Sequence, residues 1–241
     1  MATELLSRAE VDFATSRRSL LLVWQNPDSG RFVKVGQLDV LADGRFAFHY
    51  LPGAGTDPQF LELDEYPERD AVYVSNDLPV FFSNRIMSAD RPSYGQYLRW
   101  LGIEDIEAAE LPIEVLARTG GQRVTDTFHI VDLPEHFEAS FSSRFFVSGI
   151  RHNPDADRVL AALESGASLS LQLEESNKIN PKAVLIDTVD GKKVGYVPDW
   201  LCSDVHDLIK SGWSVTAVAE RVNPKAPAHV RVLCRIDAQL A

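Results

Sequence analysis

The stretch that decides the fold is residues 168–200, SLSLQLEESNKINPKAVLIDTVDGKKVGYVPDW. Leucines alternate with polar residues over 169–173, which predicts a strand with one apolar face. Asp190-Gly191 separates two further strand-like runs, and this dipeptide favours the positive-φ geometry of a tight hairpin turn. The stretch therefore predicts a small antiparallel unit, followed by the start of a helix.

Three motifs in this half of the chain resemble the HIRAN domain. A run of the form LxLxxExxNxxxxxAV begins at Leu169, and xxVGYVP follows it after the hairpin. Upstream, residues 145–153, FFVSGIRHN, match the family's opening strand and its Gly-hydrophobic-Arg signature. HIRAN domains occur at the front of fork-remodelling helicase-like translocases and as stand-alone bacterial proteins. The resemblance implies a small closed or nearly closed β-barrel, OB- or SH3-like, with two helices at residues 145–241.

The resemblance also implies a site for single-stranded DNA. In HIRAN domains that bind the 3′ end, an Arg, an aromatic neighbour and an Asn-x-aromatic-Asp loop make the contacts. Arg151 and Asn177 stand at matching positions. His152 replaces the aromatic neighbour, Ile179 the loop aromatic and Asn180 the loop Asp. Two stacking surfaces are weakened or lost, and each stacked base contributes roughly 1–3 kcal/mol.

Other side chains complete the predicted DNA pocket. Asn180 keeps an amide that can hydrogen-bond a sugar hydroxyl. Lys178 and Lys182 flank the loop and can meet phosphates, although a solvated loop explains both lysines nearly as well. Tyr196 stands at a position that faces the pocket in relatives. The predicted DNA-binding residues are thus Arg151, His152, Asn177, Lys178, Asn180, Lys182 and Tyr196.

The first part of the chain predicts a β-meander with short helices at residues 20–133. Strand-like runs flank the turn cluster Asn26-PDSG, and an Asp43-Gly44 pair closes a second hairpin. Tyr94, Tyr97, Leu98 and Leu101 recur at helical spacing, which is more typical of core packing than of a platform for nucleobases. We expect a mostly-β α+β protein with a short extension at 1–19 and a linker at 134–144.

The order of strands and turns in this part resembles the N-terminal subdomain of HipA-type kinases. No kinase core with a phosphate-gripping loop and catalytic carboxylates follows it. In three-component relatives of the HipA toxin, a separate small protein resembling this subdomain holds the kinase inactive. The resemblance therefore implies a HipA-like kinase as partner, in a bacterial toxin–antitoxin or phage-defence setting.

The net charge of −11 is concentrated in the first part of the chain. Residues 1–144 carry 13 basic and 23 acidic side chains, whereas residues 145–241 carry 11 and 12. A nearly neutral module lacks the broad basic surface of tight non-specific DNA binders, so we expect weak, salt-sensitive binding. The sequence has no apolar run of membrane-spanning length and no hydrophobic signal core at its start, which predicts a cytoplasmic protein.

The sequence offers no recognisable active site. It contains no GxSxG, HExxH, Walker-type loop or GxGxxG, and its six histidines are scattered singly. Cys202 and Cys234 lack metal-ligand spacing, so we expect two inert thiols, no metal and no cofactor. The sequence thus predicts a non-catalytic binding protein. The alternative is a purely protein-binding, antitoxin-like module with a vestigial DNA pocket, which the substitutions at His152, Ile179 and Asn180 favour.

Overall fold

The computed structural model describes residues 3–123 and 125–240, which form two compact units. The first unit comprises Met1–Tyr94 and Asp105–Leu133, and the second comprises Gly95–Glu104 and Pro134–Ala241. Each is built on one antiparallel sheet with few helices, so the expected mostly-β α+β class is confirmed.

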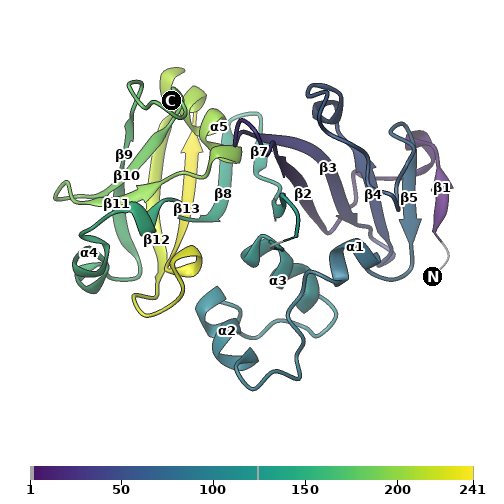
Figure 1. Ribbon diagram of the computed structural model, residues 1–241, viewed down its shortest axis with the longest axis horizontal. Helices are drawn as coiled ribbons and strands as arrows, with labels where there is room; N and C mark the ends of the chain where they lie inside the picture. The colour runs from purple at the N-terminus through teal and green to yellow at the C-terminus, as the bar shows by residue number, and fades with distance from the viewer. Residues whose placement is uncertain (1–2, 124, 241) are drawn as a thin grey trace. The chain divides into compact units, whose positions relative to one another are not determined.

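The first unit contains a six-stranded sheet in the order β1-β5-β4-β3-β2-β6 (Figure 1). Its strands are β1 (Glu4–Leu6), β2 (Arg18–Gln25), β3 (Phe32–Val40), β4 (Phe46–Tyr50), β5 (Val72–Ser75) and β6 (Phe128–Asp132). The successive antiparallel pairs β2–β3 and β3–β4 confirm the predicted β-meander.

The main core of the first unit lies on one face of this sheet. Leu20, Leu22 and Trp24 alternate along β2 and point into it, as the period of a strand requires. Helices α1 (Val80–Ser83) and α3 (Leu111–Thr119) contribute Phe82 and Leu116 to the same core. The expected packing of short helices against the meander is therefore observed.

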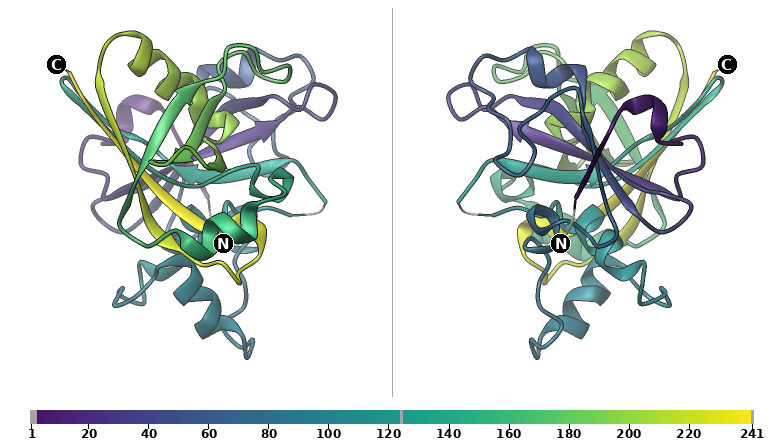
Figure 2. Two further views of the ribbon diagram at one scale, coloured as in Figure 1. Left: turned by 90° about the vertical axis from the view of Figure 1, so that its left-hand side faces the viewer. Right: turned by 90° about the vertical axis from the view of Figure 1, so that its right-hand side faces the viewer.

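Residues 1–19 are predicted as an extension, but Glu4–Leu6 and the last two residues of this segment belong to the sheet. Strand β1 pairs with β5, and the first two residues of β2 also come from this segment. Val11 and Phe13 pack against a small apolar cluster that contains Val72 and Val74. The right-hand view of Figure 2 shows this N-terminal strand.

The second unit contains a seven-stranded sheet in the order β11-β10-β9-β12-β13-β8-β7. Its strands are β7 (Glu135–Phe137), β8 (Ser140–Phe146), β9 (Ala167–Leu173), β10 (Val184–Thr188), β11 (Lys193–Tyr196), β12 (Ser214–Val222) and β13 (Val232–Gln239). Helices α4 (Ala156–Ala162) and α5 (Asp199–Lys210) lie toward opposite ends of the strands in Figure 1 and in the left-hand view of Figure 2.

The sequence predicts a closed or nearly closed β-barrel, and this topology corrects the closed alternative. Among the described residues, the pairing of named strands stays open between β11 and β7. One isolated antiparallel bridge, Ser148 with Tyr196, connects the chain just after β8 to β11. Closure therefore rests on a single bridge instead of a continuous ladder.

Two segments differ from their predicted places in the fold. The predicted linker 134–144 forms β7 and most of β8, because Phe141, Ser143 and Phe145 turn inward at alternate positions. Helix α2 (Tyr94–Leu101) groups mainly with the second unit. No helix in the described part of the chain is both long and apolar enough to cross a membrane.

Candidate nucleic-acid interface

The turn that carries Arg151, residues 149–153, is fixed onto strand β11. Ser148 and Tyr196 exchange two backbone hydrogen bonds of 2.9 Å. The Asn153 side-chain amide donates to the Lys193 carbonyl at 2.6 Å. The turn, which we call the Arg151 turn, is therefore held at both of its ends by β11.

Two glycines allow this close approach. Gly149 has a φ of +74°, and a Cβ there would lie 3.2 Å from Cδ2 of Tyr196. A Cβ on Gly195 would lie 2.4 Å from the Ser148 carbonyl oxygen, a distance that real Cβ atoms do not adopt. The glycines of SGIR and VGYV thus let the Arg151 turn pack directly on the Tyr196 ring.

Asn177 shapes the loop between β9 and β10, residues 174–183, which we call the Asn177 loop. Its side-chain carbonyl accepts hydrogen bonds from the backbone N–H groups of Ile179 (3.0 Å) and Asn180 (3.1 Å). Its amide donates to Oε2 of Glu174 at 2.6 Å. Asn177 therefore acts as an Asx-type turn residue that orders the loop from within.

Tyr196 links the two segments. Its hydroxyl donates to Oε2 of Glu174 at 3.0 Å and accepts from Nζ of Lys193 at 2.8 Å. The Lys193 ammonium also lies 4.3 Å from the centre of the Tyr196 ring, within cation–π range. Because Glu174 binds Asn177, one hydrogen-bonded chain connects the Asn177 loop to Tyr196 and thus to the Arg151 turn. We call Asn177, Glu174, Tyr196 and Lys193 the site network.

The pKa values of Glu174, in the site network, and of Asp187 are shifted in opposite directions. The hydrogen bond from Asn177 holds the pKa of Glu174 below its ordinary value. The hydrogen bond from Tyr196 and the positive charge of Lys193 act in the same direction. Burial raises the pKa of Asp187, which is 5% exposed and accepts from Gln172 at 3.0 Å. Glu174 is therefore charged at neutral pH and faces a cation, Lys193.

The cations predicted to contact DNA differ in their availability. Arg151 and Lys178 are exposed, and neither forms an ion pair with a carboxylate in the described ranges. Arg151 Nε donates to the ring of its neighbour His152 at 3.0 Å, and His152 is exposed as well. By contrast, Nζ of Lys182 is paired with Asp207 on α5 at 2.7 Å. Only the first two cations are ready to meet a phosphate.

The two loop residues that depart from the family pattern face opposite ways. Ile179 is 85% exposed, so its side chain points into solvent. Asn180 is 6% exposed, and its amide donates to Asp199 at 2.6 Å and to the thiol sulfur of Cys202. Its carbonyl accepts from the Lys182 backbone. The structure thus places Asn180 beneath the loop as a support, where it is not exposed to a sugar hydroxyl.

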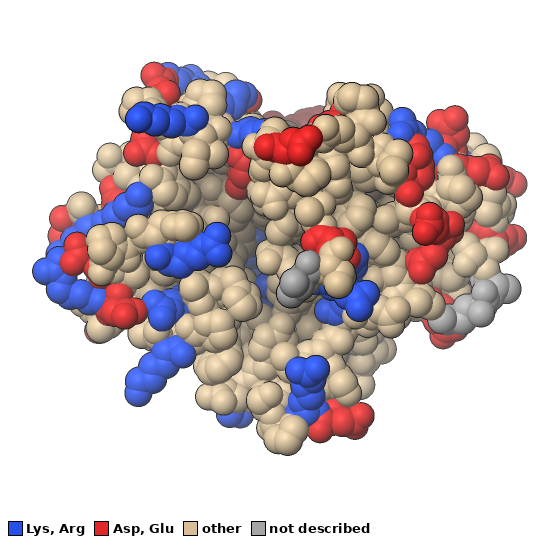
Figure 3. Space-filling model, viewed as in Figure 1, with Lys and Arg blue, Asp and Glu red and all other residues tan. Residues whose placement is uncertain are grey.

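The surface charge follows the division of the chain into units. On the face shown in Figure 3, Lys and Arg side chains gather over the second unit, whereas Asp and Glu side chains are more frequent over the first.

The described residues contain no group of three or more His, Cys, Asp or Glu side chains that could hold a metal ion.

Sequence reasoning missed two members of the site network, Glu174 and Lys193. Glu174 was present in the motif LxLxxExxN, three residues before Asn177, so its spacing offered a signal. Lys193 lies three residues before Tyr196 in β11 and carried no such signal, because its contact depends on side-chain direction.

Residues 140–241 match the family model of the HIRAN domain. The matched residues all lie within the second unit. Two solved structures are also similar to the chain. A Lactobacillus plantarum protein is 18% identical, with 41% of this chain and 96% of that one covered and a TM-score of 0.37. The HIRAN domain of human HLTF is 16% identical, with 42% and 81% covered and a TM-score of 0.34.

No curated protein matches the chain. The resemblance of residues 20–133 to the HipA N-terminal subdomain stays a prediction. The DNA-binding role of the seven predicted residues stays a prediction too.

Proposed function

We propose that the HIRAN domain of this protein binds single-stranded DNA at its 3′ end and performs no catalysis. The observation that carries the proposal is the site network. It joins the two segments that the HIRAN resemblance names, the Arg151 turn and the Asn177 loop, through Tyr196. A strand end that contacts one segment then lies within reach of the other.

Each part of this surface has a role that its chemistry allows. The Arg151 guanidinium and the Lys178 ammonium lie exposed at the rim and suit phosphate groups. The exposed Ile179 side chain offers an apolar face to a base, in place of an aromatic ring. Asn177 and Asn180 act as positioning residues, because their polar atoms bind other parts of the loop.

The proposed binding is modest in strength. Two free cations release few counterions from a single strand, and the missing aromatic rings remove roughly 1–3 kcal/mol per unstacked base. The negative Glu174 also lies at the centre of the site. We expect micromolar or weaker affinity at physiological salt.

Fluorescence anisotropy with end-labelled oligonucleotides tests the proposal. We expect the full-length protein to bind a single strand with a free 3′ hydroxyl more tightly than the same strand with a 3′ phosphate, and more tightly than a blunt duplex. Arg151→Ala weakens binding, whereas Arg158→Ala, on helix α4 and paired with Asp155, leaves it unchanged. Equal affinity for the free and blocked ends removes the end-recognition part of the proposal.

A second candidate function is protein binding without DNA. Three observations favour it, namely the loss of stacking aromatics at His152 and Ile179, the burial of Asn180 and the pairing of Lys182. In this reading the partner is a HipA-type kinase, and the setting is a bacterial toxin–antitoxin or phage-defence system. Co-purification with such a kinase, without any binding of single-stranded DNA at low salt, selects the second candidate over the first.

A further inference from the structure

The first unit contains a cavity of about 300 Å³ beside strand β4. Its volume lies at the lower end of the range for small-molecule sites. It is lined by Arg8, His49, Tyr50, Leu51, Pro52, Gly55, Arg69, Asp70, Ala71 and Val72. All of these residues belong to the first unit, so the cavity is separate from the HIRAN domain.

His49 is a buried polar residue without a hydrogen-bond partner. It is 3% exposed, and neither ring nitrogen has a partner in the described part of the chain. The closest carboxylate oxygen, Oδ2 of Asp39, is 3.7 Å from Nδ1 and also lacks a hydrogen bond. Buried polar groups in folded proteins are nearly always paired with protein or water, so the His49 imidazole at the cavity wall has a ring nitrogen available for a hydrogen bond to a bound molecule.

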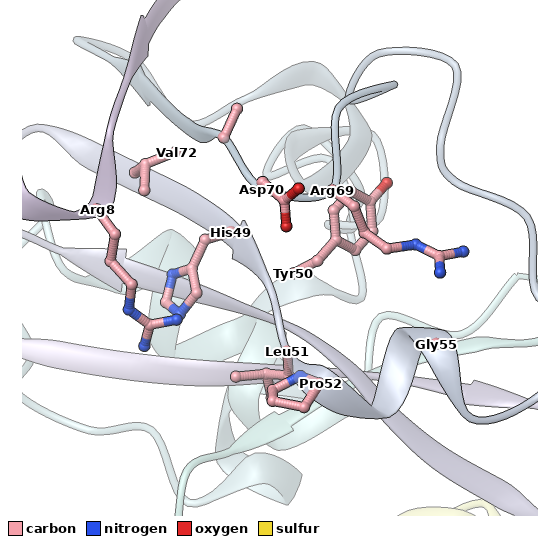
Figure 4. A pocket seen from close by; sticks show the side chains of 10 residues that line it. Arg8, His49, Tyr50, Leu51, Pro52, Gly55, Arg69, Asp70 and Val72 are labelled. Atoms are coloured by element: carbon pink, nitrogen blue, oxygen red, sulfur yellow. The ribbon is translucent and has the colours of Figure 1, made fainter.

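Arg8 provides a cation at the same wall. Figure 4 shows its guanidinium beside the His49 ring. Arg8 is exposed and forms no ion pair with a carboxylate among residues 3–123 and 125–240, and its one ring contact is Phe13 at 5.8 Å. The other arginine of the cavity, Arg69, is directed away from His49 and is paired with Glu62.

We propose that this cavity binds the oxyanion group of a small phosphorylated or carboxylated molecule between Arg8 and His49. A guanidinium offers two parallel N–H donors to such a group, and the imidazole adds another donor from the buried side. Asp70 lines the same cavity, and its carboxylate lies away from Arg8 in Figure 4. The Asp70 carboxylate favours a ligand that carries hydroxyl groups next to its oxyanion group, because those hydroxyl groups can donate hydrogen bonds to Asp70.

Isothermal titration calorimetry on the full chain tests the proposal with three probes, namely inorganic phosphate, glycerol 3-phosphate and succinate. We expect one site per chain for at least one probe. Preference for glycerol 3-phosphate over succinate identifies a phosphate ligand, and the reverse order identifies a carboxylate ligand. Arg8→Ala is expected to lower the affinity at least tenfold, as loss of a hydrogen bond to a charged group does.

His49→Phe supplies an independent test, since the new ring resembles imidazole in shape and can pack against Phe13, whose ring lies 4.9 Å from that of His49. It is expected to lower affinity at least fivefold while the protein stays folded. Arg91→Ala is the matched control, because Arg91 is an exposed arginine of the same unit outside the cavity. The proposal is overturned if no probe binds, if both cavity variants bind like the parent, or if Arg91→Ala weakens binding as much as Arg8→Ala.

Discussion

The salt dependence of the proposed DNA binding reports how many cations contact phosphates at the candidate nucleic-acid interface. Arg151 and Lys178 are exposed and free of ion pairs with described carboxylates, whereas Lys182 is neutralised by Asp207 at 2.7 Å. Lys193 donates to Tyr196 and lies close enough to lower the pKa of Glu174, so its charge is already compensated. Two phosphate contacts are therefore expected from these four cations.

Two contacts fix the magnitude of the effect. For single strands the logarithm of the binding constant falls with the logarithm of salt concentration by about 0.7 per neutralised phosphate, which gives a slope of about −1.4. Affinity then falls roughly 25-fold over a tenfold rise in salt. Arg151→Ala and Lys178→Ala are each expected to reduce the slope to about −0.7 and to weaken binding about fivefold at low salt.

The assay is fluorescence anisotropy of a labelled oligonucleotide of about ten nucleotides, measured at several salt concentrations from about 50 to about 500 mM. Lys182→Ala is the matched control and is expected to leave the slope near −1.4, because its charge is paired with Asp207. Two results refute the reasoning. One is a slope near zero in the parent protein, and the other is an equal change of slope in Lys182→Ala and Lys178→Ala.

Three further predictions concern stability, each measured by urea unfolding of the full chain. Burial lowers the pKa of His49 and of His129 to about 4. The unfolded histidines take up protons near pH 6.5 and the folded ones do not, so the free energy of unfolding falls by about 2 kcal/mol per histidine from pH 7 to pH 5. Asp39 partly offsets this fall, because burial raises its pKa. A free energy of unfolding that does not change with pH contradicts the prediction. Gly149→Ala is expected to lower the free energy of unfolding by about 2 kcal/mol and Gly166→Ala by about 1 kcal/mol. Both glycines have a positive φ, but only Gly149 lies against Tyr196. Equal losses for the two variants would mean that the Tyr196 contact is unimportant. Asn180→Ala costs about 2 kcal/mol, because it removes the hydrogen bonds that the Asn180 side chain makes with the Lys182 N–H and with Asp199. The exposed Lys178→Ala stays within about 0.5 kcal/mol, and similar values for the two variants would place Asn180 at the surface.

Local patterns predicted the strands of both units well. The alternating leucines became β9, and the Asp190-Gly191 turn connects β10 to β11 as expected. Strand β7 escaped prediction because all three of its residues are exposed and so carry no alternating pattern. The barrel is implied by the HIRAN resemblance, and its closure depends on long-range pairing, which the sequence does not encode locally. Among the described residues, the isolated bridge from Ser148 to Tyr196 connects β11 to the chain just after β8.

The position of helix α2 was also beyond local reasoning. Its helical spacing was correct, but its partners lie more than a hundred residues away. Arg221 donates to the Arg99 carbonyl at 2.9 Å, and Asn223 donates to the Trp100 carbonyl at 2.8 Å. Contacts of this kind give no signal in the spacing of the helix itself.

At the candidate site, motif spacing located the correct segments but not the direction of their side chains. Asn177 and Asn180 both looked like ligands for DNA from the sequence. In the structure, Asn177 bonds to its own loop, and Asn180 turns toward Asp199 and Cys202. Whether a polar loop side chain faces solvent or binds the backbone depends on partners from other elements, which a single motif cannot reveal.

In the proposed function, the charges of the site favour binding of a strand end over binding along the DNA backbone. Its centre holds a charged Glu174 together with Lys193, so it has little net attraction for phosphate. Its exposed cations, Arg151 and Lys178, lie on the flanking turn and loop. A strand that passes straight through must bring a phosphate close to Glu174, which costs free energy because like charges repel. A strand that ends there presents an uncharged nucleoside with a terminal hydroxyl, and this hydroxyl can donate to the Glu174 carboxylate. In the proposed function, the same carboxylate that weakens general DNA binding favours a free 3′ hydroxyl over a 3′ phosphate.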